Sequence, residues 1–310
     1  MENTRAKTTR NSLILLLTAT IWGMAFVSQS KGMDYMHPFT FNGVRSLIGA
    51  AGILLYILIS RKIAGDKAAK LDWKLNVKAG LLCGIFLTIA STLQQFGIKY
   101  TSVGKAGFIT TLYIIFVPMF GIFLKKKVAP VVWAAAGMAA VGMYLLCMTE
   151  SLRLGAGDIM VFLCAIAFAI QIMTVDHYAA RIDGAVVSCI QFTVCGVVCC
   201  IGALIWGQPT FGQLQEGMGA LLYAGVLSCG VGYTLQIVGQ KGLNPTVAAL
   251  IMSLESVIAT ISGWIAYKIG FLTTDQTLTA RQIAGCVIVF AAVILVQLPP
   301  EWFRFGQKNA

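Results

Sequence analysis

The chain has 310 residues, of which 58% are hydrophobic and only 11% are charged. A water-soluble globular domain has roughly 25% charged residues, so this composition excludes a soluble fold, whereas a bilayer accepts apolar stretches of about 20 residues as spanning helices. The net charge of +11 does not indicate nucleic-acid binding, because the basic residues lie between the apolar segments and not on a polar face rich in aromatic residues.

Ten apolar segments are long enough to cross a bilayer, and we predict an all-α polytopic membrane protein with ten transmembrane helices. The first half contributes Ser12–Ser30, Phe39–Ser60, Leu75–Ile98, Val103–Leu124 and Val131–Cys147. The second half contributes Gly157–Val175, Ala185–Trp206, Gly217–Gly239, Thr246–Ile269 and Arg281–Leu298. The connections are short and contain turn-forming Gly and Pro residues, so none of them can hold a soluble domain.

An internal repeat divides the chain. The stretch Thr92–Lys99 returns at Thr234–Lys241, with Thr, Leu, Gln, Gly and Lys unchanged in place. This alignment, called the first register below, also pairs Tyr113 with Glu255, while a slightly longer shift, the second register, pairs Arg45 with Gln191. Because each copy holds five spans, the second must enter the membrane from the opposite face. We predict two inverted five-helix repeats, residues 1–150 and 151–310.

The distribution of Lys and Arg predicts the orientation. If the N-terminus is cytoplasmic, 16 of the 23 basic residues lie on the inner side and 6 on the outer side, with Arg45 inside a span. The positive-inside rule therefore places both termini in the cytoplasm, and we expect a multi-pass protein of the plasma membrane.

Several stretches resemble the EamA family of the drug/metabolite transporter superfamily. They are Tyr100–Phe108 followed by Pro118, Trp22-Gly23, Arg45 and Leu254-Glu255-Ser256. The resemblance implies ten spans in two inverted repeats around a central cavity lined mainly by the first, third, fourth, sixth, eighth and ninth spans. The chain departs from the family pattern at Ser256, where members often have Pro, and at Lys125–Lys127 and Lys268–Phe271, which replace a frequent Gly-Glu pair.

Two charged residues, Glu255 and Arg45, lie well away from the ends of their predicted spans. Glu255 is about eleven residues into the ninth, roughly 16 Å deep, where a carboxyl group is costly unless it is protonated or partnered. We interpret it as a proton carrier or a contact for a cationic group, with helix packing as the alternative. Arg45 cannot lose its proton, and we expect it to be structural, by reaching the headgroups or bonding backbone carbonyls, rather than substrate-binding.

Uncharged residues complete the predicted binding site. Gln94, Gln95 and Gln236 can hold an amino or carboxyl group, although hydrogen bonds between helices are an equal alternative. Trp22, Tyr113 and Tyr233 can stack on an apolar or aromatic substrate or pack helices. Amide and hydroxyl groups for the same cavity come from Gln171, Thr110 and Ser253.

We expect a secondary transporter that moves a small organic metabolite, such as an amino acid or a related solute, outward by alternating access. No phosphate-binding Gly-x-x-x-x-Gly-Lys-Ser/Thr motif is present, so a gradient would supply the energy. A proton is the leading coupling ion if Glu255 titrates, with substrate-driven uniport or exchange as the alternatives. The expected partners are the lipid bilayer, a small-molecule substrate and protons, with monomer and homodimer both open.

Three alternatives remain. One is an exporter of cationic or aromatic drugs. An intramembrane enzyme is a second, but His37 and His177 lie at span ends and Glu255 is the one deep acid, so we expect no catalytic residues, no metal and no cofactor. The third is a channel, which would usually show a repeated filter or charged rings, and neither is visible in the sequence.

Overall fold

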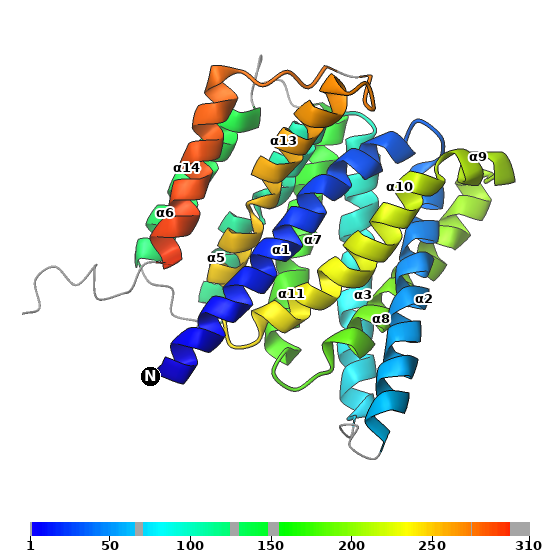
Figure 1. The fold of residues 1–310 in the computed structure, drawn as a ribbon, viewed down its shortest axis with the longest axis horizontal. Coiled ribbons are helices and arrows are strands. Elements are labelled where there is room, and N and C mark those ends of the chain that lie inside the picture. Colours follow the sequence, from blue (N-terminus) through cyan, green and yellow to red (C-terminus); the bar gives the residue numbers. More distant parts are fainter. Residues whose placement is uncertain (1, 66–70, 125–129, 148–154, 274, 298–310) are drawn as a thin grey trace, which may run out of the picture.

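The computed structural model describes residues 2–65, 71–124, 130–147, 155–273 and 275–297. Every regular element in these ranges is helical, which confirms the predicted all-α class for this part of the chain, and the long helices run side by side (Figure 1). Eight segments are long and apolar enough to cross a bilayer, so the prediction of a multi-pass membrane protein is confirmed. They are Lys7–Gly32, Pro38–Ala64, Trp73–Ile98, Val103–Phe123, Ala156–Tyr178, Gly184–Gly207, Met218–Gln240 and Pro245–Lys268.

The elements follow the predicted spans closely. The first half consists of α1 (Glu2–Gly32), α2 (Pro38–Ala64), α3 (Trp73–Ile98), α4 (Val103–Thr111), α5 (Tyr113–Phe123) and α6 (Pro130–Cys147). The second half begins with α7 (Ala156–Tyr178), α8 (Gly184–Gly202), the π-helical turn η2 (Ala203–Gly207), α9 (Phe211–Glu216) and α10 (Met218–Leu222). It continues with the π-helix η3 (Tyr223–Gly232), α11 (Tyr233–Gln240), α12 (Pro245–Met252), α13 (Glu255–Lys268) and α14 (Ala280–Gln297).

The fifth and tenth predicted spans form the shorter apolar helices α6 and α14, which pack against each other at one side of the molecule (Figure 1). Each has 18 residues and is about 27 Å long at 1.5 Å per residue, slightly less than the ~30 Å hydrocarbon core. The structure thus supports eight spans by length and composition, and the number ten stays a prediction.

Polar side chains define the helix ends. Asp72 and Asp183 begin α3 and α8 by accepting backbone N–H groups, and Asn244 does the same for α12, whose first residue is proline. Such caps satisfy amide groups that a helix start leaves unpaired. The turn before Asn244 contains Gly242 at φ +79°, a conformation that glycine adopts without strain.

The predicted fourth and ninth spans are each two helices rather than one. The fourth is interrupted at Leu112, whose amide bonds Ile109 three residues back, and the ninth at Ser253 and Leu254, where the amide of Leu254 bonds Ile251 in the same way. These tight turns fall at corresponding positions of the two halves, because the first register pairs Leu112 with Leu254. The eighth span is also divided, because η3 inserts a π-helical stretch where the first half has the regular α3.

Packing between the halves is reciprocal. The second helices of the two halves, α2 and α8, pack against each other. The third span of the first half, α3, packs against α7, the first span of the second half. In the same way η3 and α11, from the third span of the second half, pack against α1. Helix α2 approaches η3 closely because Gly225 of η3 has no side chain. A methyl group at this position would lie 2.7 Å from Ile48 and 2.9 Å from the Arg45 carbonyl. The core is therefore built between the halves and not within each of them.

The structure shows which loops share a face. The N-terminal end of α1, the end of α2, the α7–α8 turn and the end of α11 lie at one end of the bundle, as Figure 1 shows. Among the residues that predicted the orientation, Lys67, Lys70, Lys125, Lys126, Lys127, Arg153, Arg304 and Lys308 lie outside the described residues. The orientation of the termini stays a prediction.

Candidate functional site

A cavity lies at the centre of the bundle, between the two halves. Its lining residues are buried, except for half-buried Trp22. They are Trp22, Phe26, Gln29, Arg45, Ser46, Leu87, Ser91, Gln94, Thr110, Tyr113, Phe168, Gln171, Ile172, Phe192, Ser228, Cys229, Tyr233, Gln236 and Glu255. The free volume is about 40 Å³. Since a water molecule needs roughly 10–15 Å³ by this measure, the cavity admits a few waters, and an organic solute requires the helices to separate.

Corresponding positions of the two halves line the cavity. In α3 they are Leu87, Ser91 and Gln94, spaced as one helix face, and the first register pairs them with Cys229, Tyr233 and Gln236 of η3 and α11. In the second register, Trp22 corresponds to Phe168, Phe26 to Ile172 and Ser46 to Phe192. Each half thus contributes these corresponding positions to the one cavity, but the side chains at most of them differ between the halves.

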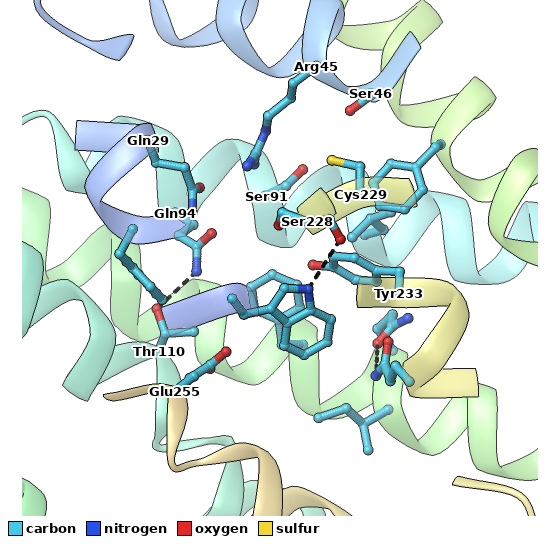
Figure 2. Close-up of a pocket in the computed structure, with 18 of the residues that line it drawn as sticks. Gln29, Arg45, Ser46, Ser91, Gln94, Thr110, Ser228, Cys229, Tyr233 and Glu255 are labelled. Atoms are coloured by element: carbon cyan, nitrogen blue, oxygen red, sulfur yellow. Dashed lines mark hydrogen bonds between the residues drawn. The ribbon is translucent and has the colours of Figure 1, made fainter. Parts of the chain in front are cut away.

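Glu255 stands at the first residue of α13, directly after the interruption of the ninth predicted span, and is 3% exposed. Its Oε1 accepts a hydrogen bond of 3.1 Å from the hydroxyl of Tyr113, which occupies the corresponding position in the first half. Thr110, one turn before Tyr113, accepts a 3.2 Å hydrogen bond from Gln94 Nε2. Figure 2 shows the Glu255 carboxyl group on the same side of the cavity as Thr110.

Arg45 enters the cavity from the opposite side, with its guanidinium group directed inward (Figure 2). It is 5% exposed, its Nε donates to Asn42 Oδ1 at 2.9 Å within α2, and it lies 5.4 Å from the Phe41 ring. Ion pairs in the described part of the chain are Lys31–Asp34 and Lys105–Asp158, so Arg45 and Glu255 share a cavity without pairing with each other or with another charge. Sequence reasoning expected Arg45 outside the cavity lining, and the structure places it within.

Two glutamines of the cavity wall, Gln236 and Gln171, belong to a chain of buried amides that ends at Gln191, outside the lining. Gln236 Nε2 donates to Gln171 Oε1 at 3.2 Å, and Gln171 Nε2 donates to Gln191 Oε1 at 3.4 Å. Both ends of the chain are open, because Gln236 Oε1 and Gln191 Nε2 are buried without a partner. The cavity wall therefore retains the Gln236 acceptor, while the Gln191 donor lies outside the cavity lining.

An aromatic surface forms another wall. The rings of Trp22 and Tyr233 are 4.5 Å apart between centroids, and Phe192 meets Tyr233 edge-on at 4.9 Å. Trp22 Nε1 donates to the carbonyl of Ser228 in η3 at 3.4 Å. This hydrogen bond links the indole of α1 to the second half. The flat faces of these rings offer contact to an apolar or aromatic group.

The structure brings most of the predicted binding residues together. Trp22, Gln94, Thr110, Tyr113, Gln171, Tyr233, Gln236 and Glu255 all line the cavity. Gln95 lies outside it, since the next residue along a helix points about 100° away, and its Nε2 donates to the Gln29 carbonyl. Ser253 is also not among the lining residues, and its hydroxyl donates to the Leu250 carbonyl.

Some lining residues were missed by sequence reasoning. Gln29 and Ser91 are polar and buried, and Gln29 Oε1 has no partner. The helical spacing from Trp22 through Phe26 to Gln29, and from Ser91 to Gln94, could have identified them. Phe192 could not have been identified in this way, because it is one apolar residue among many in its span. Neither its helix α8 nor α2 was expected to line the cavity. No group of three potential metal ligands occurs among the described residues.

The sequence matches the model of the EamA-like transporter family twice, over residues 10–148 and 155–298. It is 27% identical over 290 residues to an uncharacterized transporter of Archaeoglobus fulgidus, covering 92% of this chain and 84% of the relative. It is 24% identical to the uncharacterized transporter YwfM of Bacillus subtilis, covering 94% of each. A crystal structure with 16% identity has the same fold, with a TM-score of 0.73 over 96% of this chain and 99% of the other. These names indicate transporters rather than enzymes.

Proposed function

The chain belongs to the EamA-like transporter family, and from this we propose that it is a secondary transporter that works by alternating access. The moving parts are two inverted five-helix repeats, residues 1–150 and 151–310. In this proposal α6 and α14 are the fifth and tenth spans and meet as symmetry-related partners. The reciprocal packing of the halves and the cavity positions that correspond in the first and second registers support the arrangement.

The substrate is a small zwitterionic metabolite, an amino acid or a related solute. The observation that carries this proposal is the position of Arg45 and Glu255 on opposite sides of one cavity, unpaired with each other. Charged groups buried in a membrane are costly, and a solute that carries one charge of each sign can pair with both. A guanidinium group binds a carboxylate, and the Glu255 carboxylate, next to the Tyr113 hydroxyl, binds an ammonium group.

Polar contacts between the halves lie toward both ends of the bundle, and in this proposal they close the cavity. At one end Asp158, which is 4% exposed, accepts from Lys105 Nζ at 2.6 Å and from Thr101 Oγ1 at 2.9 Å. At the other end Asn11 Nδ2 donates to the carbonyl of Lys241 at 2.7 Å. Alternating access requires these two sets to break in turn, and the small free volume of the cavity fits an occluded state between them.

Proton coupling through Glu255 supplies the energy, and the transport direction is outward across the plasma membrane, with both termini in the cytoplasm. Glu255 is suited to carry a proton because it is the buried acid of the cavity and its Tyr113 partner can bond either protonation state. The excess of Lys and Arg on the N-terminal side supports the orientation.

One observation favours a second substrate class, cationic or aromatic drugs. The wall of Trp22, Tyr233 and Phe192 would stack on an aromatic ring, and Glu255 would pair with a cation. Arg45 distinguishes the two classes, because its fixed positive charge repels a cation that carries no carboxylate.

Thermal unfolding of the purified full-length protein tests the substrate class. The protein is screened against amino acids, the matching amines that lack the carboxylate, quaternary amines, nucleosides and sugars. We expect amino acids to raise the midpoint and their decarboxylated amines to have much less effect. Stabilisation by quaternary amines alone would contradict the zwitterion and support the drug class. Liposome flux of the stabilising compound, with and without an imposed pH gradient, then tests transport and coupling.

A further inference from the structure

A second cleft, with its own set of lining residues, lies at the end of the bundle that carries the N-terminus. It has a volume of about 620 Å³ and is open to the outside. The end of α2, the residues before and within the first turn of α3, the α7–α8 turn and the end of α11 form its walls. None of its lining residues contributes to the central cavity, so it requires an explanation of its own.

The mouth of the cleft is positively charged. Arg61, Arg181 and Lys241 line it together with Asp72 and Asp183. Both acids already serve as helix caps: Asp72 accepts from the Leu75 amide, and Asp183 from the Ala185 and Val186 amides. Neither Arg181 nor Lys241 forms an ion pair with a described carboxylate, and their bonds go to the carbonyls of His177 and Ile182. Arg181 and Lys241 therefore retain N–H groups that can donate to an anion.

The remainder of the cleft is mostly apolar, apart from Ser60, Asn76 and Thr234, and its α2 side carries exposed apolar side chains. Tyr56 and Ile57 of α2 and Val238 of α11 line it below the charged mouth. Tyr56 is 61% exposed, and the surface continues onto Leu55 and Leu58, each 59% exposed. In a spanning helix, such exposed apolar side chains contact lipid. The cleft thus joins a cationic mouth at the membrane surface to a lipid-facing groove.

We propose that this cleft binds an anionic phospholipid from the leaflet on the N-terminal side. The phosphate group contacts Arg181 and Lys241, and one acyl chain lies along Tyr56, Ile57 and Val238. The apolar floor favours a lipid over a free phosphate ion, which would leave that surface uncovered. The excess of basic residues on this face matches a leaflet with a negative surface potential. A bound lipid would link α2, from the first half, to α11 and the α7–α8 turn, from the second.

Thermal unfolding of the full-length protein in nanodiscs tests the site. Discs of phosphatidylcholine receive increasing fractions of phosphatidylglycerol, and we expect the anionic lipid to raise the midpoint in a saturable way. Arg181→Gln and Lys241→Gln should each raise the half-saturating fraction about fivefold, the effect of one basic residue near an anionic membrane surface. Lys74→Gln is the matched control, because Lys74 is exposed in the first turn of α3 but does not line the cleft.

Three outcomes would overturn the proposal. Equal stability in both lipids would remove the anionic preference. An equal loss in Lys74→Gln would show a general surface charge effect rather than a site. Inorganic phosphate that stabilises the protein in pure phosphatidylcholine discs as strongly as phosphatidylglycerol does would assign the cleft to a free ion. If Lys241→Gln does not fold because it loses its bond to Ile182, Arg181→Gln still decides the question.

Discussion

The hydroxyl of Tyr113 donates a 3.1 Å hydrogen bond to Glu255 Oε1, although the two residues are far apart in the chain. Their separation is the one that relates Thr92–Lys99 to Thr234–Lys241, so each residue occupies the other's place in the opposite half. Each also directly follows the tight turn that interrupts its span. A single repeated position therefore supplies both partners of a hydrogen bond in the cavity lining.

Replacing Tyr113 with Phe should destabilise the protein slightly while retaining its packing. Hydrogen bonds between membrane helices are worth about 0.6 kcal/mol on average and up to about 1.7 kcal/mol, so we expect a small but measurable fall in the thermal midpoint. Tyr233→Phe is the control, since the Tyr233 hydroxyl lies in the same cavity without a hydrogen bond to a described residue. Equal falls in both variants would show that the Tyr113–Glu255 bond contributes nothing specific.

Replacing Glu255 with Gln should abolish transport or make it independent of pH. Gln has the same shape and can still accept from Tyr113, but it can neither carry a proton nor pair with an ammonium group. The measurement is substrate flux in liposomes over a series of pH values. Asp275→Asn, a change at an exposed loop acid, should behave like the unmodified protein. Unchanged flux and pH dependence in Glu255→Gln would remove this residue from the mechanism.

Replacing Arg45 with Gln should weaken binding of a zwitterionic substrate roughly ten- to hundredfold, because a hydrogen bond to a charged group contributes about 1.5–3 kcal/mol. Binding of the matching amine, which has no carboxylate, should not weaken. Arg45→Lys keeps the charge but loses the planar fork, so its loss should be intermediate. Comparison of the two ligands in all three proteins separates carboxylate recognition from a structural role. Equal weakening of acid and amine would indicate that Arg45 only supports the helices.

The sequence predicted the class of fold and several polar residues of the cavity, because polar residues are few within the long apolar segments that a bilayer requires. Long apolar segments identify the helices, and residues such as Glu255 and Gln236 stand out inside them. The direction in which a side chain points was harder to predict. Gln94 and Gln95 are equally polar, yet Gln94 lines the cavity and Gln95 contacts α1, a difference set by the neighbouring helices.

The position of Arg45 shows the same limit. Nothing in the sequence near Arg45 indicates that α2 lies close enough for its side chain to enter the cavity. That approach depends on glycines in a distant segment, where Gly225 of η3 lies against Ile48 and the Arg45 carbonyl. The interruptions at Leu112 and Leu254 were also not predicted, because no Gly or Pro stands within four residues of either leucine to indicate a break in the helix.

Replacing Gly225 with Ala should separate α2 from η3 and displace Arg45. The added methyl group would stand 2.7 Å from Ile48 Cγ2 and 2.9 Å from the Arg45 carbonyl oxygen. Overpacking of this kind costs about 1–3 kcal/mol, so we expect a lower thermal midpoint and weaker substrate binding. Gly219→Ala is the matched control, because its added methyl group would meet no atom within 4 Å. Similar behaviour of the two variants would show that the close approach of α2 and η3 is unimportant.

Replacing His37 with Asn should make stability less dependent on pH. His37 precedes α2, and its Nδ1 accepts the Phe39 amide at 3.4 Å. Burial, together with the charge of Lys99, lowers the pKa of His37 below its ordinary value of about 6.5. The folded protein thus favours neutral histidine, so this contribution to stability is complete above the ordinary pKa and is lost as the pH falls from there through the lowered pKa of the folded state.

Asn keeps the ability to cap the helix but does not titrate, so it isolates this effect. The thermal midpoints of both proteins are measured at about pH 7.5 and about pH 5.5, on either side of the ordinary pKa of about 6.5. We expect the unmodified protein to lose more stability on acidification than His37→Asn does. The variant also loses the ring contacts of His37 with Phe39 and Phe96, so its midpoint is expected to be lower at both pH values. The difference between the two pH values is therefore the decisive quantity, and an equal fall in both proteins would show that His37 does not titrate in this range.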